Sequence, residues 1–234
     1  YPIGYFFGYK AIGVFQTQEE IDSYISPATG KPIQPNAAPG DTKFEDLNGD
    51  GVISDDNEDR TMIGKPNPDW MVGLTVAADW NGFDLSAFFQ GSFGADVFDA
   101  LRRYELAAVN YTSDALERWT GPGTSNSMPR IVLGDTPKNF RPSTLLVHDA
   151  SFLRLRNLQV GYTLPAQLTR KAYIQRLRFY ASFDNLLTIT GYKGMDPEIG
   201  STMGIDKGVY PQARVYTFGL NLTCLLYTSD AADD

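Results

Sequence analysis

The alternation of side chains over residues 70–93 constrains the fold of this chain most strongly. The even positions of 70–80 and the odd positions of 83–93 are apolar or small, and most positions between them are polar or small. A period of two residues is typical of β-strands that present one apolar and one polar face. Asn81-Gly82, the preferred pair of a type I′ turn, separates the two stretches. The pattern predicts an antiparallel hairpin.

The same alternation recurs towards the C-terminal end of the chain. Further apolar positions with this period are Leu177, Phe179, Ala181, Phe183, Tyr216, Phe218, Leu220 and Leu222. Within 152–164 the parity changes, because Leu153 and Leu155 are odd whereas Leu158 and Val160 are even. A β-bulge near Arg156-Asn157 would absorb that change. We therefore expect an all-β fold of antiparallel strands.

One insertion has a different pattern. Over about 97–119, Val97, Leu101 and Tyr104 have the spacing of a helix, and a Gly/Pro/Ser/Asn-rich loop follows at 121–129. We expect residues 97–130 to form an insertion with a short helix and a loop.

Two architectures fit these strands. A soluble sandwich would bury the apolar face against a second sheet, whereas a membrane barrel would turn that face to lipid. The stretch 70–80 is about 33 Å long at ~3.3 Å per residue. Tilted by roughly 45°, it would span about 23 Å, close to the ~25 Å apolar band of an outer-membrane barrel. Trp70 and Trp80 then stand where interfacial aromatic residues gather, so the length favours the barrel.

The acidity of the chain is local. The formal net charge is −8. Acidic residues are concentrated between 41 and 60, at Asp41, Glu45, Asp46, Asp50, Asp55, Asp56, Glu58 and Asp59. Only Lys43 and Arg60 oppose them there. No basic patch suggests a nucleic-acid partner. We expect an acidic loop at 41–64.

Residues 46–53 of this loop, DLNGDGVI, have the spacing of a calcium loop. Oxygen-bearing side chains stand at alternate positions, and a glycine then permits a sharp turn. The candidate calcium ligands are Asp46, Asn48, Asp50, the Val52 carbonyl, Asp56 and Asp59. A solvated acidic loop built from Asx turns is the alternative.

Catalytic chemistry has little support in the sequence. His148 is the single histidine, and no nucleophile elbow, zinc motif or nucleotide loop accompanies it. We therefore expect neither an enzyme nor a cofactor other than calcium. Arginines on the polar faces of the expected strands are Arg154, Arg156, Arg176 and Arg178. We expect them to pair with Asp184 and other acids, and contact with a substrate is the alternative. Tyr104, Tyr111 and Trp119 offer stacking surfaces for sugars, although a small loop core is the simpler interpretation.

Several segments in a fixed order resemble one family. An acidic NGDG loop is followed by Asp59-Arg60-Thr61, Ile63-Gly64 and Asn67-Pro68-Asp69, and then by the hairpin 81–86 and Phe89-Gln90-Gly91. Later segments are SFLRLRNL at 151–158, GYTLP at 161–165, Asn185-Leu186, Thr190-Gly191-Tyr192, Asp196-Pro197-Glu198 and Tyr210-Pro211 with Arg214 and Thr217. From about Gly8 to Thr223 the chain resembles the C-terminal part of SusC/RagA-type TonB-dependent outer-membrane transporters of Bacteroidota.

The resemblance implies a function. The family fold is a 22-stranded transmembrane barrel with an N-terminal plug, and this chain would supply its last strands and their extracellular loops. The family imports oligosaccharides or peptides through the outer membrane, with a SusD-like surface lipoprotein as lid and TonB as energy source. The plug and TonB box are missing here, so the chain alone would not transport. A soluble extracellular β-module, stabilised by calcium and serving adhesion or carbohydrate binding, is the alternative.

The chain departs from the family pattern in two places. Asp59 stands at position 14 of the calcium-type loop, two residues later than the family pattern places it. Residues 224–234, which contain the single cysteine Cys224, resemble the conceptual translation of a transposase sequencing adapter. We therefore expect 1–223 to be the barrel portion and 224–234 to be an artefactual tail that pairs with no strand.

Overall fold

The computed structural model describes residues 2–102, 104, 106, 110–198 and 203–224. The chain divides into two compact units. The first contains residues 1–69, 94–150 and 192–210, and the second contains 70–93, 151–191 and 211–234. No helix among the described residues is long and apolar enough to cross a membrane.

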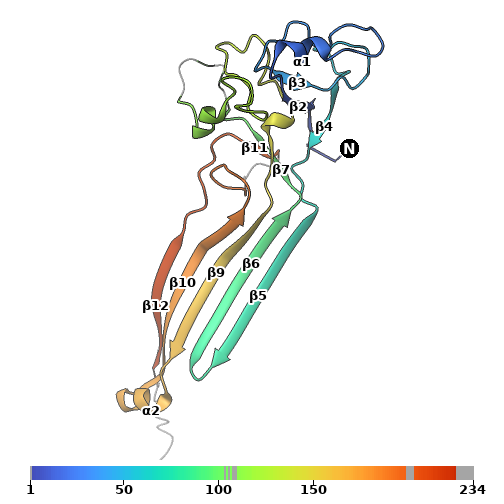
Figure 1. Ribbon diagram of the computed structural model, residues 1–234. Helices are drawn as coiled ribbons and strands as arrows, with labels where there is room; N and C mark the ends of the chain where they lie inside the picture. Colours follow the sequence, from blue (N-terminus) through green and yellow to red (C-terminus); the bar gives the residue numbers. More distant parts are fainter. Residues whose placement is uncertain (1, 103, 105, 107–109, 199–202, 225–234) are drawn as a thin grey trace, which may run out of the picture. The chain divides into compact units, whose positions relative to one another are not determined.

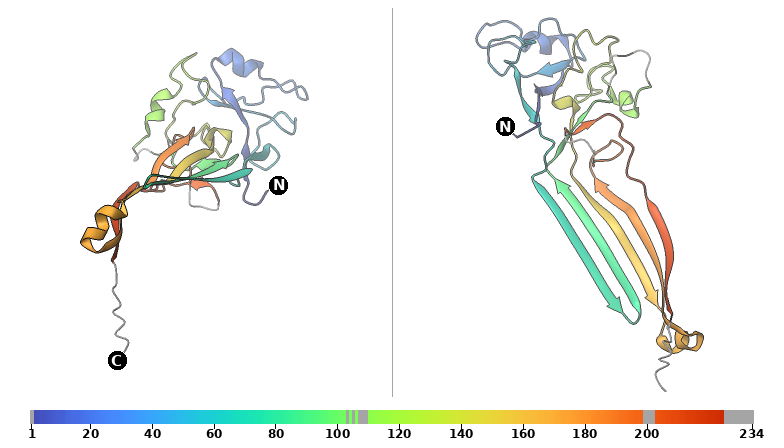
Figure 2. Two further views of the ribbon diagram at one scale, coloured as in Figure 1. Left: turned by 90° about the horizontal axis from the view of Figure 1, so that it is seen from below. Right: turned by 180° about the vertical axis from the view of Figure 1, so that it is seen from behind.

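The second unit is a five-stranded antiparallel sheet with the strand order β12-β10-β9-β6-β5 (Figure 1). Its strands are β5 (Trp70–Trp80), β6 (Phe83–Phe93), β9 (Phe152–Thr163), β10 (Ile174–Thr190) and β12 (Val215–Cys224). Figure 2 shows the same order of strands from behind. Between β9 and β10 the chain forms the helical turns α2 (Ala166–Thr169) and η3 (Arg170–Ala172). The predicted antiparallel all-β fold is confirmed.

The hairpin of β5 and β6 has the predicted strands and turn. Trp70 pairs with Phe93 and Trp80 with Phe83, without a break in register. Asn81 has φ 48° and Gly82 has φ 86°, the left-handed values that a type I′ turn requires. A side chain at Gly82 would also bring a Cβ within 2.8 Å of the Thr163 carbonyl oxygen.

The predicted bulge lies in the middle of β9. Phe88 pairs with Asn157 and Phe89 with Leu155, so Arg156 is the extra residue. β10 shifts register at the same level, between Asp184 and Leu187. Leu153 and Leu155 therefore stay on the same face as Leu158 and Val160, although their parity differs. Without the bulge, one half of β9 would turn its leucines to the other face.

One face of this sheet is apolar across all five strands. On β5 it carries Trp70, Val72, Leu74, Val76, Ala78 and Trp80. Trp70 is 73% exposed and Phe218 on β12 is 76% exposed. Among the described residues of this unit no second sheet covers the face. An apolar face of this size requires another apolar medium or partner to cover it.

The first unit consists of short strands joined by long loops. β1 (Phe6–Tyr9) pairs with β4 (Arg60–Gly64), and β2 (Ala11–Val14) pairs with β3 (Thr42–Phe44). α1 (Gln18–Ser23) follows β2, and Thr17 caps its N-terminus. Phe15 and Phe44 are almost fully buried in this unit.

A three-stranded sheet in the first unit connects three distant segments. β7 (Asp96–Asp99) lies between β8 (Val147–Asp149), which is antiparallel to it, and β11 (Ile205–Asp206), which is parallel. Two 3₁₀ turns, η1 (Ser113–Glu117) and η2 (Thr144–Leu146), lie in the connecting loops.

Two expectations need correction. The start of the 97–130 insertion is strand β7 rather than helix, because its backbone pairs with β8 and β11, and the 3₁₀ turn η1 is the helical part described there. Residues 103, 105 and 107–109 lie outside the described part. Cys224, which we expected to pair with no strand, pairs with Ile174 in the terminal ladder, while the artefactual origin of 224–234 stays a prediction. Residues 225–234 lie outside the described part as well.

Candidate functional site

The acidic loop connects β3 to β4 and is anchored by two aspartates. Asp46 accepts hydrogen bonds from the backbone N–H groups of Gly49 (2.8 Å) and Gly51 (2.9 Å). Asp59 has no exposed surface and accepts from Leu47 N (3.2 Å) and Ser54 N (2.8 Å). Asp59, at position 14 of the calcium-type loop, therefore closes the loop by accepting hydrogen bonds from the backbone of Leu47 and of Ser54.

The other predicted calcium ligands divide into two places. Asn48 and Asp50 share the turn that Asp46 caps, where Asn48 Nδ2 donates to Asp50 Oδ2 (3.0 Å) and Val52 N donates to Asp50 Oδ1 (2.9 Å). Asp56 lies on the outer arm and accepts from Glu58 N (3.1 Å) and from the Ser54 hydroxyl. The Ser54 hydrogen bond lowers the pKa of Asp56.

The loop has the Asx turns of the alternative interpretation. Every predicted carboxylate ligand accepts at least one backbone N–H. Over the described ranges, no three His, Cys, Asp or Glu side chains form a group that would hold a metal ion. Calcium binding by Asp46, Asn48, Asp50, Val52, Asp56 and Asp59 stays a prediction.

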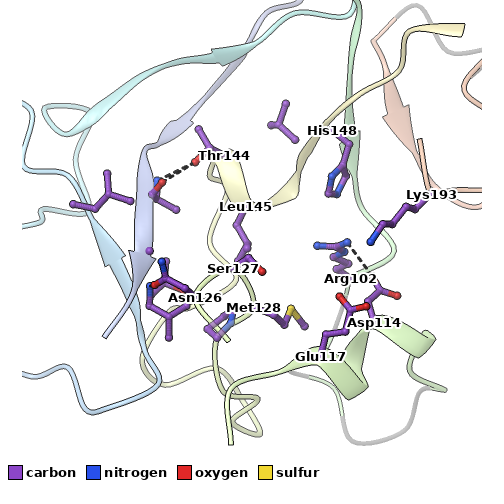
Figure 3. Close-up of a pocket in the computed structure, with 17 residues that line it drawn as sticks. Arg102, Asp114, Glu117, Asn126, Ser127, Met128, Thr144, Leu145, His148 and Lys193 are labelled. Carbon is purple, nitrogen blue, oxygen red and sulfur yellow. Dashed lines mark hydrogen bonds and ion pairs between the residues drawn. The ribbon is translucent and has the colours of Figure 1, made fainter. Parts of the chain in front are cut away.

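A cavity of about 520 Å³ lies elsewhere in the first unit (Figure 3). Its walls come from β2, from residues 126–129, from residues 144–148, and from Arg102, Asp114, Glu117 and Lys193. A second hollow of about 360 Å³ shares Arg102, Asp114, His148 and Lys193 with it. These four side chains are therefore the polar boundary of both hollows.

Arg102 is held rigidly at this boundary. Its guanidinium lies 3.1 Å from Asp99 Oδ2 and 2.9 Å from Asp114 Oδ2, and its side chain is 13% exposed. Asp99 ends β7 and Asp114 belongs to η1, so two separate segments fix one guanidinium. Arg102 Nε has no hydrogen-bond partner in the described structure, so its contact with Asp99 is an ion pair by distance alone.

His148 belongs to β8 and lines both hollows together with Arg102. Burial, which disfavours the charged imidazolium, and the nearby Arg102 cation together hold the pKa of His148 below its ordinary value. His148 Nε2 lies 3.8 Å from Asp99 Oδ2, too far for a hydrogen bond, and is a buried polar atom without a hydrogen-bond partner in the described structure. Burial and the Arg102 charge thus disfavour the protonated form of His148.

Tyr192 supports the other side of the boundary. It is 8% exposed, packs with Val97 and Ala150, and donates to Asp206 Oδ2 at 2.6 Å. Burial and the Asp206 hydrogen bond raise the pKa of Tyr192 far above its ordinary value. The next residue, Lys193, extends from this fixed position to the cavity.

The polar face of the five-stranded sheet contains the predicted arginines. Arg178 forms two contacts with the Asp84 carboxylate. Arg156, at the bulge, donates to Gln90 Oε1 (2.7 Å) and Asn185 Oδ1 (3.2 Å), and Arg154 donates to Thr188 Oγ1 (2.9 Å). The predicted pairing with an acid is confirmed for Arg178. Asp184 accepts a hydrogen bond from the side-chain amide of Asn157, whose Nδ2 lies 2.7 Å from Asp184 Oδ1.

Of the three aromatic residues of the insertion, Tyr104 belongs to a small core. Tyr104 is 1% exposed and packs with Ala115 and Met128. Trp119 donates from Nε1 to Gln16 Oε1 at 3.1 Å, and its ring lies against Gly40. Tyr111 is 44% exposed, so it keeps an accessible ring. The interpretation of Tyr104 as part of a loop core is confirmed.

Sequence reasoning did not identify Arg102, Asp114 and Lys193 as cavity residues. Lys193 lies far from Arg102 and Asp114 in the sequence, and the fold brings all three to the same cavity. For Lys193 the sequence does contain one indication, because this residue directly follows the Thr190-Gly191-Tyr192 motif.

No family model matches the chain. TonB-dependent receptor P3 of Formosa agariphila is 34% identical to the chain over 231 residues, which cover 94% of the chain and 22% of the receptor. TonB-dependent receptor SusC of Bacteroides thetaiotaomicron is 30% identical over 217 residues, covering 92% of the chain and 20% of that protein.

Solved structures agree with these relatives. The RagAB peptide transporter aligns with a TM-score of 0.67 at 27% sequence identity, covering 93% of the chain and 22% of the matched chain. The closed state of the RagAB peptide importer aligns with a TM-score of 0.66 at 26% identity. The chain spans about a fifth of the length of the proteins that it matches.

Proposed function

The chain belongs to the SusC/RagA-type TonB-dependent transporters as a C-terminal part of their barrel, and from this premise we propose that the whole protein imports oligosaccharides or peptides through the outer membrane. The proposal extends to two partners, a SusD-like surface lipoprotein that covers the barrel and the TonB complex that supplies energy. It assigns the protein a transport role and no catalytic one. One relative is named SusC, and a structural relative is a peptide importer.

The apolar face of the five-stranded sheet is the observation that carries this proposal. Its central strands have the length that an outer-membrane barrel requires, and the opposite face carries polar groups such as Gln90, Arg156 and Asn157. The alternative, a calcium-stabilised soluble module, needs a second sheet over the apolar face. The described residues of this unit contain no such sheet.

Gene deletion in the source bacterium tests the proposal. The deletion strain is grown with single oligosaccharides or peptides as nutrient, alongside a strain that carries the full-length gene in trans. We expect the deletion to abolish growth on a restricted set of these nutrients and complementation to restore it. Normal growth on every oligosaccharide and peptide, together with recovery of the protein from the soluble fraction, would contradict an import function.

A further inference from the structure

The turn between β9 and β10, residues 164–173, lies at the end of the five-stranded sheet where the connections are short. Thr163 N donates to Gly82 O at 2.7 Å, so this turn begins beside the two-residue turn of the β5–β6 hairpin (Figure 1). The connections at the opposite end are long, since residues 94–151 join β6 to β9 and residues 191–214 join β10 to β12. Outer-membrane barrels place their short turns on the periplasmic side. The turn 164–173 therefore belongs to the periplasmic side of the proposed barrel.

A row of aromatic side chains crosses the apolar face just before this turn. The row follows direct cross-strand pairs, namely Trp80 with Phe83, Phe83 with Tyr162, and Tyr162 with Phe179. Trp80 is 76% exposed, and the ring centroids of Phe83 and Tyr162 lie 4.5 Å apart. Aromatic belts of this kind mark the headgroup level of a membrane. Leu164 follows Tyr162 by two residues, about 7 Å along the strand, so the turn begins close to that level.

The segment that contains this turn is basic. Between Asp149 and Asp184 the sequence has no acidic residue, although the formal net charge of the chain is −8. The basic residues of this stretch are Arg154, Arg156, Arg170, Lys171, Arg176 and Arg178. Arg170 and Lys171 are exposed in η3, and neither forms an ion pair with a carboxylate of the described residues. The turn therefore presents two cations to its surroundings.

The acids at this end of the sheet are balanced by other cations. Among the described residues these acids are Asp79 and Asp84, which line a hollow on the polar face. Arg178 Nε donates to Asp84 Oδ1 at 2.9 Å, and Arg176 lines the same hollow as Asp79. The two cations of η3 do not line that hollow. The described carboxylates therefore leave the charge of η3 uncompensated, and this end of the sheet has a net positive charge.

Apolar side chains flank the two cations of η3. Leu168 is 61% exposed and Tyr173 is 70% exposed. Leu168 and Lys171 are three residues apart in the consecutive turns α2 and η3, a spacing that places both on one side of a helical turn. Thr169 is 4% exposed and donates to Ala166 O at 3.4 Å, which fixes the turn from its buried side. The exposed side thus combines cations with apolar groups, as elements that lie on a membrane surface do.

We propose that the turn 164–173 binds the headgroups of anionic phospholipids at the periplasmic surface of the outer membrane. Arg170 and Lys171 pair with the headgroup phosphates, while Leu168 and Tyr173 enter the interface next to the aromatic row. A zwitterionic lipid gains less from this contact, because its own cation repels the two basic side chains. The inference rests on the proposed function, since only in an outer-membrane barrel does this turn lie at a lipid surface.

The lipid preference of the purified full-length protein is measured by native mass spectrometry. The probes are dioleoyl phosphatidylglycerol, which is anionic, and dioleoyl phosphatidylcholine, which is zwitterionic and has the same acyl chains. Each basic residue near an anionic surface contributes about fivefold in affinity, so we expect phosphatidylglycerol to bind about 25-fold more tightly. The preference should decrease with added salt, which screens exposed charges. Equal affinity of the unsubstituted protein for the two lipids overturns the proposal.

Substitution of both cations locates the site. The double variant Arg170→Gln/Lys171→Gln should lose the preference, whereas Arg170→Lys/Lys171→Arg should keep it. Lys31→Gln/Lys207→Gln is the matched control, because it removes two exposed lysines of the first unit. Equal preference in the two Gln double variants overturns the assignment. The amount of unsubstituted protein in the outer-membrane fraction is scored separately, since its absence there would contradict the proposed function rather than the lipid site alone.

Discussion

Asp41 is a buried charge that depends on a complete set of donors. Its side chain is 3% exposed and contacts Arg130 Nε at 2.6 Å and Nη2 at 3.1 Å. Asn139 Nδ2 and Ala38 N complete the set at 3.1 and 2.8 Å. Because Asp41 starts the segment that leads into β3, this cluster fixes the base of the acidic loop.

Removal of Arg130 should therefore destabilise the first unit. Arg130→Met leaves the Asp41 carboxylate buried without its cation. We expect the free energy of unfolding to fall by about 3 kcal/mol. This value is at the low end for a broken buried ion pair because Arg130 is partly exposed. Thermal unfolding of the full-length protein measures the change. Lys31→Met, which removes an exposed charge in the same unit, is the control. Equal melting temperatures for the two variants would contradict the role of the pair.

His148 should make stability depend on pH in a defined window. Its pKa is lowered in the folded protein, first by burial and then by Arg102. The unfolded chain therefore takes up the proton first, and stability falls as the pH drops below the ordinary histidine value of ~6.5. We expect His148→Gln to reduce the loss of melting temperature between pH 7.5 and 5.5. Since this is the single histidine, an unchanged slope in the variant would exclude His148 as its cause.

The bulge of β9 keeps the apolar side chains of both halves of that strand on the same face of the sheet. Arg156 is the extra residue, and on either side of it Leu155 and Leu158 share the apolar face. Deletion of Arg156 would restore regular pairing but would turn one half of the strand over. We expect this deletion to abolish insertion of the full-length protein into the outer membrane. Arg156→Ala keeps the backbone and removes the side chain, with its contacts to Gln90 and Asn185 among others, so we expect it to insert. Failure of both variants alike would show that the Arg156 side chain matters, not the bulge.

The acidic loop provides a second test at the scale of one element. If calcium binds there, ligand binding stabilises the loop by mass action, by about 2.7 kcal/mol at a hundredfold excess over Kd. We expect calcium, compared with EDTA, to protect residues 46–59 of the full-length protein from proteolysis, and Asp46→Asn to remove that protection. Asp22→Asn alters an exposed acid outside the loop and should keep it. Cleavage at the same rate with calcium and with EDTA would favour the solvated Asx-turn loop.

Elements defined by local sequence were predictable, whereas elements that depend on distant partners were not. The hairpin 70–93 follows from its period and from Asn81-Gly82, and the bulge follows from the parity change at Arg156. The segment at 97 has the apolar spacing of a helix, yet Val97 pairs with His148, which no local pattern could show. The cavity could not be predicted for the same reason, since Arg102 and Lys193, which both line it, are distant in the sequence.

At the scale of the whole molecule, the apolar face supports the proposed place of the protein in the outer membrane. Each strand of the five-stranded sheet contributes side chains to that face, and those of β5 are exposed along the whole strand. Barrels of the outer membrane place such a face against lipid and keep the polar face inside. In that setting two neighbouring residues of one strand have opposite environments, because successive side chains point to opposite faces.

Val76 and Thr75 form such a pair near the middle of β5. Val76 pairs with Ala87 on the apolar face, whereas Thr75 pairs with Phe88 on the opposite face. Val76→Arg would place a charge in lipid near the midplane, at a cost of about 2–4 kcal/mol, whereas Thr75→Arg would point into the polar interior. In the full-length protein we expect Val76→Arg to lower the amount of folded protein in the outer-membrane fraction, and Thr75→Arg to leave it near the unsubstituted level. Equal amounts for the two variants would mean that lipid does not cover this face of the sheet.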